Sequence, residues 1–274
     1  MEKKAFIVSL SSDIGLELAK SWSAQGIHVD GSYRNETDAL SNYGESQGSR
    51  LMKCNLSSSA DCEDAFLDYL NDSDSSWDYL VFATGTQEPV GNFDKVNFDD
   101  WSLSINVNAI NQLRILHKLL PIRNLKDGRR PIVFFFAGAG SNSAPPHYSA
   151  YIASKIFLTK MTELLSTEIT DTTFVIVGPG WVKTKIHEAT LSAGENLAGL
   201  NYNKTKDMLR SEACTDIASI IRTFDWIRFA PTDAVNGRNF SVAFDQIGSP
   251  ELLAALQNEP EMYKLRRNGN SWKG

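Results

Sequence analysis

Residues 5–22 read AFIVSLSSDIGLELAKSW, and this stretch contains the first unit of the fold. The apolar run over residues 5–9 predicts a short β-strand. A turn of small residues follows, and then Ile14, Leu18 and Trp22 fall on one face of a helix. A strand that passes through a short turn into a helix is the building unit of doubly wound α/β sheets.

The same alternation continues along the chain. Short runs bounded by turn signals, several of them rich in Val, Ile and Phe, predict further strands at 27–33, 50–54, 79–83, 132–136, 173–177 and 240–242. Apolar residues at helical spacing predict helices over 61–70, 102–120 and 151–168. We therefore expect one α/β domain over residues 1–248, with a doubly wound parallel sheet (a Rossmann fold) and helices on both faces. Residues 249–274 form a C-terminal extension after the last strand.

Composition excludes several classes of protein. The 274 residues carry a formal net charge of −6, which argues against nucleic acid or an anionic membrane as the main partner. No run approaches about 18 consecutive apolar residues, so no membrane span is expected, and the polar start does not suit a signal peptide. The three cysteines, Cys54, Cys62 and Cys214, have no metal-binding spacing and suit a reducing cytoplasm. We expect no metal.

The turn at residues 8–15 is a candidate phosphate site, because the first strand-to-helix turn of a doubly wound sheet meets the pyrophosphate of a dinucleotide. Asp13 is unusual there, since a carboxylate repels phosphate. Aspartate tolerates left-handed backbone angles, so it can replace a glycine, or it can cap a helix that starts at Ile14. An ordinary serine-rich turn is the alternative. The candidate contacts are Ser9, Ser11, Ser12, Asp13 and Ile14.

The end of the second strand distinguishes between two cofactors. NAD sites place an acid about 20 residues past the glycines, whereas NADP sites place an arginine near the 2′-phosphate. Arg34 stands at this position, and the nearest acids, Asp30 and Glu36, lie to either side of it. The planar guanidinium binds phosphate in a bidentate way. The sequence favours NADP, with NAD or a plain surface arginine as alternatives.

Tyr151 and Lys155 are spaced i, i+4, which places both side chains on one face of the predicted helix. A free tyrosine has a pKa of about 10, and a nearby ammonium favours the phenolate and lowers that pKa. Tyr151 can then exchange a proton with a carbonyl or alcohol oxygen while hydride moves to or from nicotinamide.

These features together resemble the short-chain dehydrogenase/reductase family from about residue 4 to about residue 244. Asn55-Leu56 follows the third strand, Phe82-Ala83-Thr84-Gly85 stands where the family has Asn-Asn-Ala-Gly, and Asn108 lies in the helix before Leu120-Pro121. The resemblance continues through Tyr151 and Lys155 to residues 179–184, which read PGWVKT, and to Asn236-Gly237-Arg238. The order and spacing of these residues carry the resemblance.

The resemblance implies roles. Tyr151 is the proton donor or acceptor, Lys155 lowers its pKa and bonds the nicotinamide ribose, and Asn108 supports a water-linked proton path. The remaining cofactor contacts that it implies are Asn55 and Leu56 at the adenine, Ala83, Thr84 and Gly85 near the ribose, and Pro179, Gly180, Val182 and Thr184 toward the nicotinamide. It also implies a homodimer or homotetramer, formed through the helices that carry Asn108 and Tyr151. The tail residue Trp272 is a further candidate for contact with a neighbouring subunit.

One expected residue is missing. The family normally has a serine about a dozen residues before the tyrosine, and its hydroxyl holds the substrate oxygen. That register falls here on Ala137 or Gly138. Ser141, Ser143 or backbone N–H groups of the glycine-rich loop are the possible replacements.

Residues 183–214 are polar, lack a strong strand and lie where the family has its substrate lid. His187, in this segment, is expected on the surface, while His147 and Tyr148 are expected to border the pocket. We expect an NADP(H)-dependent carbonyl reductase or alcohol dehydrogenase that acts on a small polar, sugar-like substrate. The alternatives are a non-catalytic NADP-binding protein and an epimerase with a tightly held cofactor.

Overall fold

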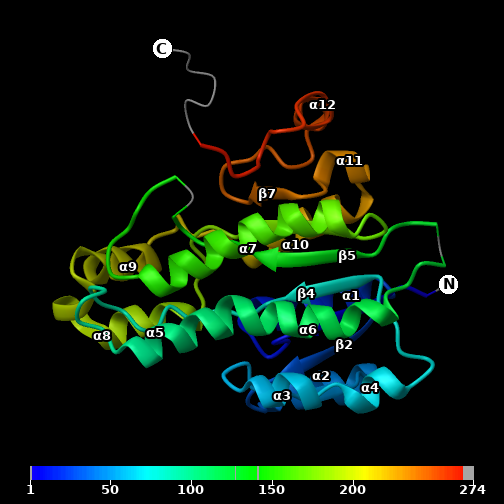
Figure 1. The fold of residues 1–274 in the computed structure, drawn as a ribbon, viewed down its shortest axis with the longest axis horizontal. Helices are drawn as coiled ribbons and strands as arrows, with labels where there is room; N and C mark the ends of the chain where they lie inside the picture. The colour runs from blue at the N-terminus through cyan, green and yellow to red at the C-terminus, as the bar shows by residue number, and fades with distance from the viewer. Residues whose placement is uncertain (1, 127, 141, 268–274) are drawn as a thin grey trace.

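Seven strands form one parallel sheet in the computed structural model, which describes residues 2–126, 128–140 and 142–267 (Figure 1). Their order across the sheet is β3-β2-β1-β4-β5-β6-β7. The strands are β1 (Lys4–Val8), β2 (His28–Tyr33), β3 (Leu51–Lys53), β4 (Tyr79–Phe82), β5 (Ile132–Phe136), β6 (Thr173–Gly178) and β7 (Arg238–Ser241). The predicted doubly wound parallel sheet is confirmed, and each predicted strand lies within two residues of its observed bounds.

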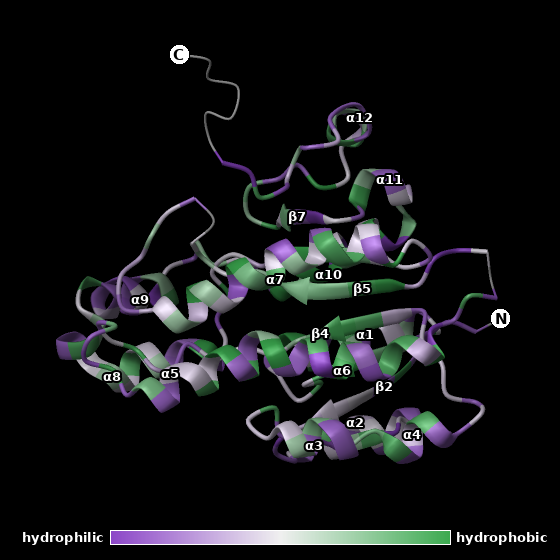
Figure 2. Cartoon of the chain, viewed as in Figure 1, coloured by the Kyte–Doolittle hydropathy of each residue, from purple (hydrophilic) through white to green (hydrophobic). Residues whose placement is uncertain are grey.

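The pleat of the strands divides their side chains between two cores. In β5, Phe134 faces one core while its neighbours Val133 and Phe135 face the other. All three are fully buried, which explains why the central strands read as unbroken apolar runs. Figure 2 shows β5 as an almost continuously hydrophobic strand between helices of mixed character.

Helices cover both faces of the sheet. The first core contains residues of α1 (Asp13–Ala24), α2 (Asp38–Gln47), α10 (Ile217–Phe229), α11 (Thr232–Val235) and α12 (Pro250–Asn258). The second core contains residues of α3 (Ser59–Asp64), α4 (Leu67–Asn71), α6 (Asn111–Leu119) and α7 (Ser149–Glu168). None of the described helices is long and apolar enough to cross a membrane.

The carboxyl ends of all strands meet at one edge of the sheet, the left-hand edge in Figure 1. The chain leaves β1 toward β2 on one side and later returns to place β4 on the other side. The strand order therefore reverses between β1 and β4, and such a switch point is where α/β sheets bind ligands. The lid lies over the same edge and consists of η3 (Lys185–His187), α8 (Glu188–Ala198) and α9 (Leu200–Arg210).

Two of the predicted helices differ from the observed ones, and the sequence did not predict α2, α10, α11 or α12. The predicted helix 61–70 is two short helices, because Phe66 breaks the run with φ −111° and ψ 5° and is fully buried against Phe6. The predicted helix 102–120 begins earlier, as α5 (Phe98–Ile105), and continues through a π-helical turn, η1 (Asn106–Ile110), into α6. It ends in the 3-10 turn η2 (Leu120–Ile122), which contains Pro121.

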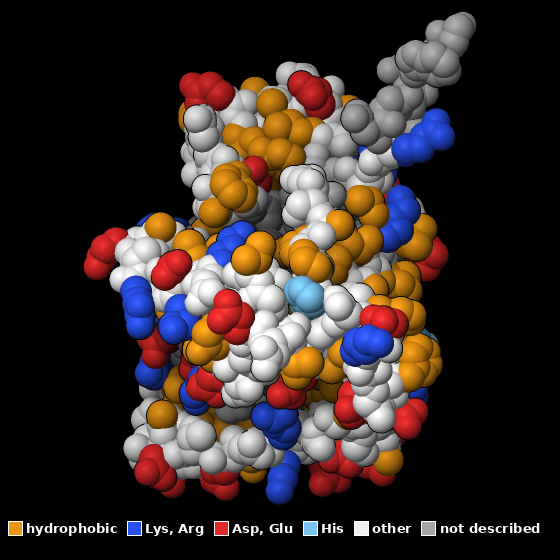
Figure 3. All heavy atoms as spheres, turned by 90° about the vertical axis from the view of Figure 1, so that its left-hand side faces the viewer, with side chains coloured by type: hydrophobic (Ala, Val, Ile, Leu, Met, Phe, Trp, Pro, Cys, Tyr) orange, Lys and Arg blue, Asp and Glu red, His pale blue; other side chains and the backbone are white. Residues whose placement is uncertain are grey.

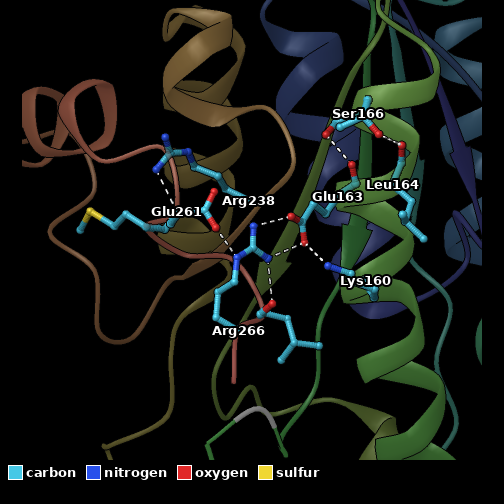
Figure 4. A network of polar contacts seen from close by, with 10 residues as sticks. Lys160, Glu163, Leu164, Ser166, Arg238, Glu261 and Arg266 are labelled. Carbon is cyan, nitrogen blue, oxygen red and sulfur yellow. Dashed lines mark hydrogen bonds and ion pairs between the residues drawn. The ribbon is translucent and has the colours of Figure 1, made fainter. Parts of the chain in front are cut away.

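The chain after β7 packs against the domain. Leu252 and Leu256 of α12 belong to the first core, and the Arg238 guanidinium donates hydrogen bonds to three carbonyls of this segment. Arg266 pairs with Glu163 of α7 at 2.6 Å and also with Glu261, as Figure 4 shows. Trp272 lies outside the described residues. The boundary predicted at residue 248 stays a prediction.

Candidate active site

The turn between β1 and α1 uses its serines in different ways. Ser9 has φ 61°, so it adopts the left-handed backbone that was expected at Asp13. Ser12 caps α1, because its hydroxyl accepts a hydrogen bond from Gly15 N at 3.1 Å. The prediction that Asp13 caps the helix or takes a glycine conformation is therefore wrong, since it lies inside the first turn of α1. Ser11 and Ile14 are half-buried beside it.

The Asp13 side chain reaches across to the lid. Its Oδ2 accepts a hydrogen bond from the backbone N–H of Lys185 at 2.9 Å, and its Oδ1 lies 4.0 Å from Lys185 Nζ. These residues are 172 positions apart in the sequence. The contact joins the turn after β1 to the first residue of η3.

The loop after β4 lies beside the same turn. The hydroxyls of Ser9 and Thr84 are hydrogen-bonded at 2.6 Å, and Ala83 N donates to Val8 O at 3.0 Å. Gly85 is exposed, and a Cβ placed there would lie 3.9 Å from both Asn108 Oδ1 and Lys155 Nζ. The predicted ribose-side residues thus lie between the turn after β1 and the helix that carries Tyr151 and Lys155.

The candidate adenosine contacts lie at the ends of β2 and β3. Arg34 follows β2 directly and is exposed. Asn55 is half-buried, and its Oδ1 accepts a hydrogen bond from Ser57 N at 3.1 Å. Leu56 is buried in the second core. Since β2 and β3 are neighbours in the sheet, all three residues lie on one side of the switch point.

Tyr151 and Lys155 lie in the first two turns of α7, with Lys155 Nζ 5.8 Å from the centroid of the Tyr151 ring. Lys155 is 2% exposed, and its Nζ donates to Thr84 O at 3.3 Å. Burial raises the pKa of Tyr151 to about 12 and lowers the pKa of Lys155 to about 8. The expected lowering of the tyrosine pKa is not found in this state, because burial disfavours the charged phenolate.

Gly138, one of the two positions where the missing serine is expected, has no room for a side chain. A Cβ at Gly138 would lie 2.8 Å from the Tyr151 hydroxyl and 2.9 Å from Lys155 Cγ. The Tyr151 side chain therefore uses the space that a serine at position 138 would need. Ser143 is exposed, and Ser141 lies outside the described residues.

Asn108 lies in the π-helical turn and is fully buried. Its side-chain amide accepts from Thr86 N at 2.9 Å and donates to Thr86 O at 2.9 Å and Ser104 Oγ at 3.1 Å. Its backbone oxygen accepts from Gln112 Nε2 at 2.8 Å. Asn108 thus holds the loop after β4 in place, and the sequence reasoning missed its partners Thr86, Ser104 and Gln112.

The loop after β6 carries Pro179, Gly180, Val182 and Thr184. Val182 is buried, and the Thr184 hydroxyl lies 3.5 Å from Val182 O. His187 was expected on the surface but is 7% exposed, because its ring stacks on Trp181 at 5.0 Å and bonds Val182 O at 3.0 Å. Burial lowers the pKa of His187. His187 and Trp181 therefore brace this loop.

A chain of polar side chains joins the lid to the domain. The Tyr148 hydroxyl is hydrogen-bonded to the Thr190 hydroxyl at 2.8 Å, and Thr190 donates to Gln87 Oε1 at 2.9 Å. His147, beside Tyr148, lies against Gly199 at the junction of α8 and α9. Figure 3 views this side of the molecule, where acidic and basic side chains are interspersed around hydrophobic ones. The described residues include no cluster of three His, Cys, Asp or Glu side chains that suits a metal.

Comparison with known proteins identifies the family. A family model described as Enoyl-(Acyl carrier protein) reductase matches residues 8–221. The human protein named Dehydrogenase/reductase SDR family member 2, mitochondrial, is 25% identical over 248 residues, which are 87% of this chain and 84% of the relative. D-beta-hydroxybutyrate dehydrogenase from Cupriavidus necator is 26% identical over 211 residues, 74% of this chain and 80% of the relative.

A solved short-chain dehydrogenase from Shigella flexneri complexed with NADP has a TM-score of 0.70 and 19% identity. The match covers 88% of this chain and 96% of that one. The chain belongs to the short-chain dehydrogenase/reductase family. It is an oxidoreductase of the kind that uses a nicotinamide cofactor.

Proposed function

We propose that the protein is an NADP(H)-dependent carbonyl reductase or alcohol dehydrogenase whose proton chemistry rests on Tyr151 and Lys155. The placement of this pair carries the proposal. Both side chains lie at the carboxyl edge of the sheet, and Lys155 Nζ bonds Thr84 O in the loop after β4. The loop therefore connects the Tyr–Lys pair to the switch point, where a dinucleotide binds in this fold.

The residues at this edge suit a dinucleotide. A Cβ at Gly15 would lie 2.7 Å from Ser12 Oγ and 2.9 Å from Ser9 O, so the turn and the helix are in close contact, as a phosphate-binding turn requires. Arg34 is exposed after β2 and is able to bind a 2′-phosphate, which favours NADP over NAD. Thr184 and Val182 would hold the nicotinamide end, and a bound nicotinamide supplies or accepts the hydride.

The protonation state of the pair favours reduction. A Tyr151 pKa of about 12 keeps the phenol protonated at neutral pH, as a proton donor to a carbonyl oxygen must be. The carbonyl oxygen accepts the Tyr151 proton while its carbon accepts the hydride, and an alcohol forms. Lys155, with a pKa of about 8, is mostly an ammonium at neutral pH and stabilises the resulting phenolate.

The substrate oxygen is held without the usual serine. We propose that backbone N–H groups of the glycine-rich loop after β5 take this role, since Gly138 has no hydroxyl and Ser143 is exposed. Tyr148 and Gln87 are half-buried, and both are hydrogen-bonded to Thr190 of the lid. These polar groups support a small polar, sugar-like substrate.

We also propose that the protein is a cytoplasmic homodimer or homotetramer. Leu103 and Ile110 on α5 and η1 are 40% and 37% exposed, and Phe157 and Leu164 on α7 are each 41% exposed. Large apolar side chains exposed on adjoining helices are typical of an interface between subunits. Light scattering should give a mass of at least two chains. Leu103→Lys together with Phe157→Lys should reduce it to one.

Tyr151→Phe tests the catalytic proposal. This variant should lose at least about a hundredfold in NADPH oxidation across a carbonyl panel, because general acid catalysis contributes about 10²–10⁴-fold. Its affinity for NADPH, measured by fluorescence titration, should stay within about twofold. Tyr43→Phe removes a hydroxyl that bonds Ser23 between α1 and α2, away from the site, and should keep full turnover. Unchanged turnover in Tyr151→Phe would refute the catalytic role.

A non-catalytic NADP-binding protein is the second candidate. Gly138 favours it, because the position of the usual serine has neither a hydroxyl nor room for one. It predicts that wild type binds NADPH and oxidises none of the carbonyl compounds.

A further inference from the structure

Asp13 places a carboxylate at the end of the turn between β1 and α1, among the neutral side chains of Ser9, Ser11 and Ser12. It is the first residue of α1 and follows β1 at the switch point between β1 and β4. The amino end of this helix is where the pyrophosphate of a dinucleotide lies in this fold. A carboxylate is stabilised at a helix amino end for the same electrostatic reason as a phosphate.

The Asp13 carboxylate is not used to cap α1. Ser12 already provides the capping oxygen for Gly15 N. The carboxylate instead accepts the backbone N–H of Lys185 at 2.9 Å and lies 4.0 Å from the Lys185 ammonium. It therefore makes contacts of the kind that a bound phosphate makes, with a backbone N–H and a cation.

We propose that Asp13 is an internal substitute for a cofactor phosphate, so that a dinucleotide binds only by displacing its carboxylate from Lys185. The inference rests on the proposed function, since it concerns the affinity of the same cofactor site. Asp13 is thus a determinant of cofactor affinity: its charge repels the phosphates, and its contact with the Lys185 N–H has to break before a dinucleotide binds. Because Lys185 is the first residue of η3, cofactor binding is also coupled to the start of the lid.

The inference assigns the weaker dinucleotide binding to the charge of Asp13. Asp13→Asn removes this charge with little change in the shape of the side chain. The amide oxygen of asparagine still accepts a hydrogen bond from Lys185 N. We expect Asp13→Asn to bind NADPH at least ten times more tightly than wild type, which corresponds to about 1.4 kcal/mol. Asp13→Gly should give a gain of the same order.

Glu17→Gln provides the matched control. Glu17 lies one turn further along α1, pairs with Lys20 at 2.8 Å and is exposed, so this variant makes the same change of net charge. It should bind NADPH within twofold of wild type. Adenosine 2′-monophosphate is the second probe, because it carries the 2′-phosphate without the pyrophosphate. Its affinity should be the same in wild type and in Asp13→Asn.

Calorimetric titration of the full chain with both probes separates the outcomes. The inference is supported if Asp13→Asn binds NADPH more tightly than wild type, Glu17→Gln does not, and the affinity for adenosine 2′-monophosphate is unchanged. Equal NADPH affinity in wild type and Asp13→Asn overturns it and leaves the proposed function standing. An equal gain in affinity for both probes also overturns the inference, and so does the same gain in Glu17→Gln. In either case the effect would come from the change in net charge and not from Asp13 itself. If no variant binds NADPH or NADH, the proposed function fails and the inference fails with it.

Discussion

Serine at position 138 restores the hydroxyl that the family normally carries, yet we expect it to damage this protein. The new Cβ would lie 2.8 Å from the Tyr151 hydroxyl, 2.9 Å from Tyr151 Cε1 and 2.9 Å from Lys155 Cγ. All three distances are shorter than normal contacts between such atoms. Both side chains lie on α7 and would have to move together. Inserting atoms into a packed region costs about 1–3 kcal/mol.

Thermal melts and turnover measure the consequence of Gly138→Ser. At about 2–4 °C per kcal/mol, the midpoint should fall by roughly 2–12 °C. NADPH oxidation should fall by about a hundredfold, because a displacement of about 1 Å at a reacting group has an effect of that size.

Gly178→Ala is the control for this substitution. Its Cβ would meet Phe240 O at 3.5 Å and Ala137 Cβ at 3.8 Å, which are ordinary contacts. This variant should melt close to wild type. A Gly138→Ser protein that keeps its melting point and turns over faster would refute the placement of Tyr151 against Gly138.

Three further predictions concern the ionisable side chains Lys155, Glu163 and Arg34. Between pH 8 and pH 10 the unfolded chain binds a proton at Lys155 that the folded chain, with its pKa of about 8, does not. The free energy of unfolding should therefore rise by about 2–3 kcal/mol over this range, and urea melts of Lys155→Met should lack this rise; equal slopes would contradict the burial of the ammonium. Arg266 and Lys160 hold the pKa of Glu163 at about 2, so this carboxylate stabilises the fold above pH 4.5 and the effect is lost as the pH falls toward 2. Glu163→Gln should cost about 1–2 kcal/mol at pH 6 and less at pH 3, and a cost independent of pH would argue against the ion pair in Figure 4. Arg34→Gln should weaken NADPH about 10–100-fold and change NADH by less than about twofold, whereas equal losses would exclude contact with the 2′-phosphate.

The sequence predicted the sheet well because the central strands β1, β4, β5 and β6 are short apolar runs between turn signals. It missed α2, in which only Leu40, Tyr43 and Gly44 are buried, so that no regular apolar face is visible. It also merged α3 and α4, because nothing local indicates that Phe66 leaves helical geometry to pack against Phe6. Such breaks are decided by tertiary contacts.

Much of the candidate site was also predictable, because residues that follow parallel strands meet at one edge of the sheet. The environment of each residue was not predictable from the sequence. The contact of Asp13 with Lys185 joins residues 172 positions apart, and the burial of His187 depends on Trp181. The raised pKa of Tyr151 depends on burial that a helical spacing alone does not reveal.

A crystal structure of the full chain grown with saturating NADPH tests the central claim most directly. The account predicts a dinucleotide along the carboxyl edge of the sheet, with its 2′-phosphate beside Arg34 and its nicotinamide beside Tyr151. It also predicts that the Asp13 carboxylate is turned away from Lys185 N. A nucleotide bound elsewhere, or one whose nicotinamide lies far from Tyr151, would contradict the account.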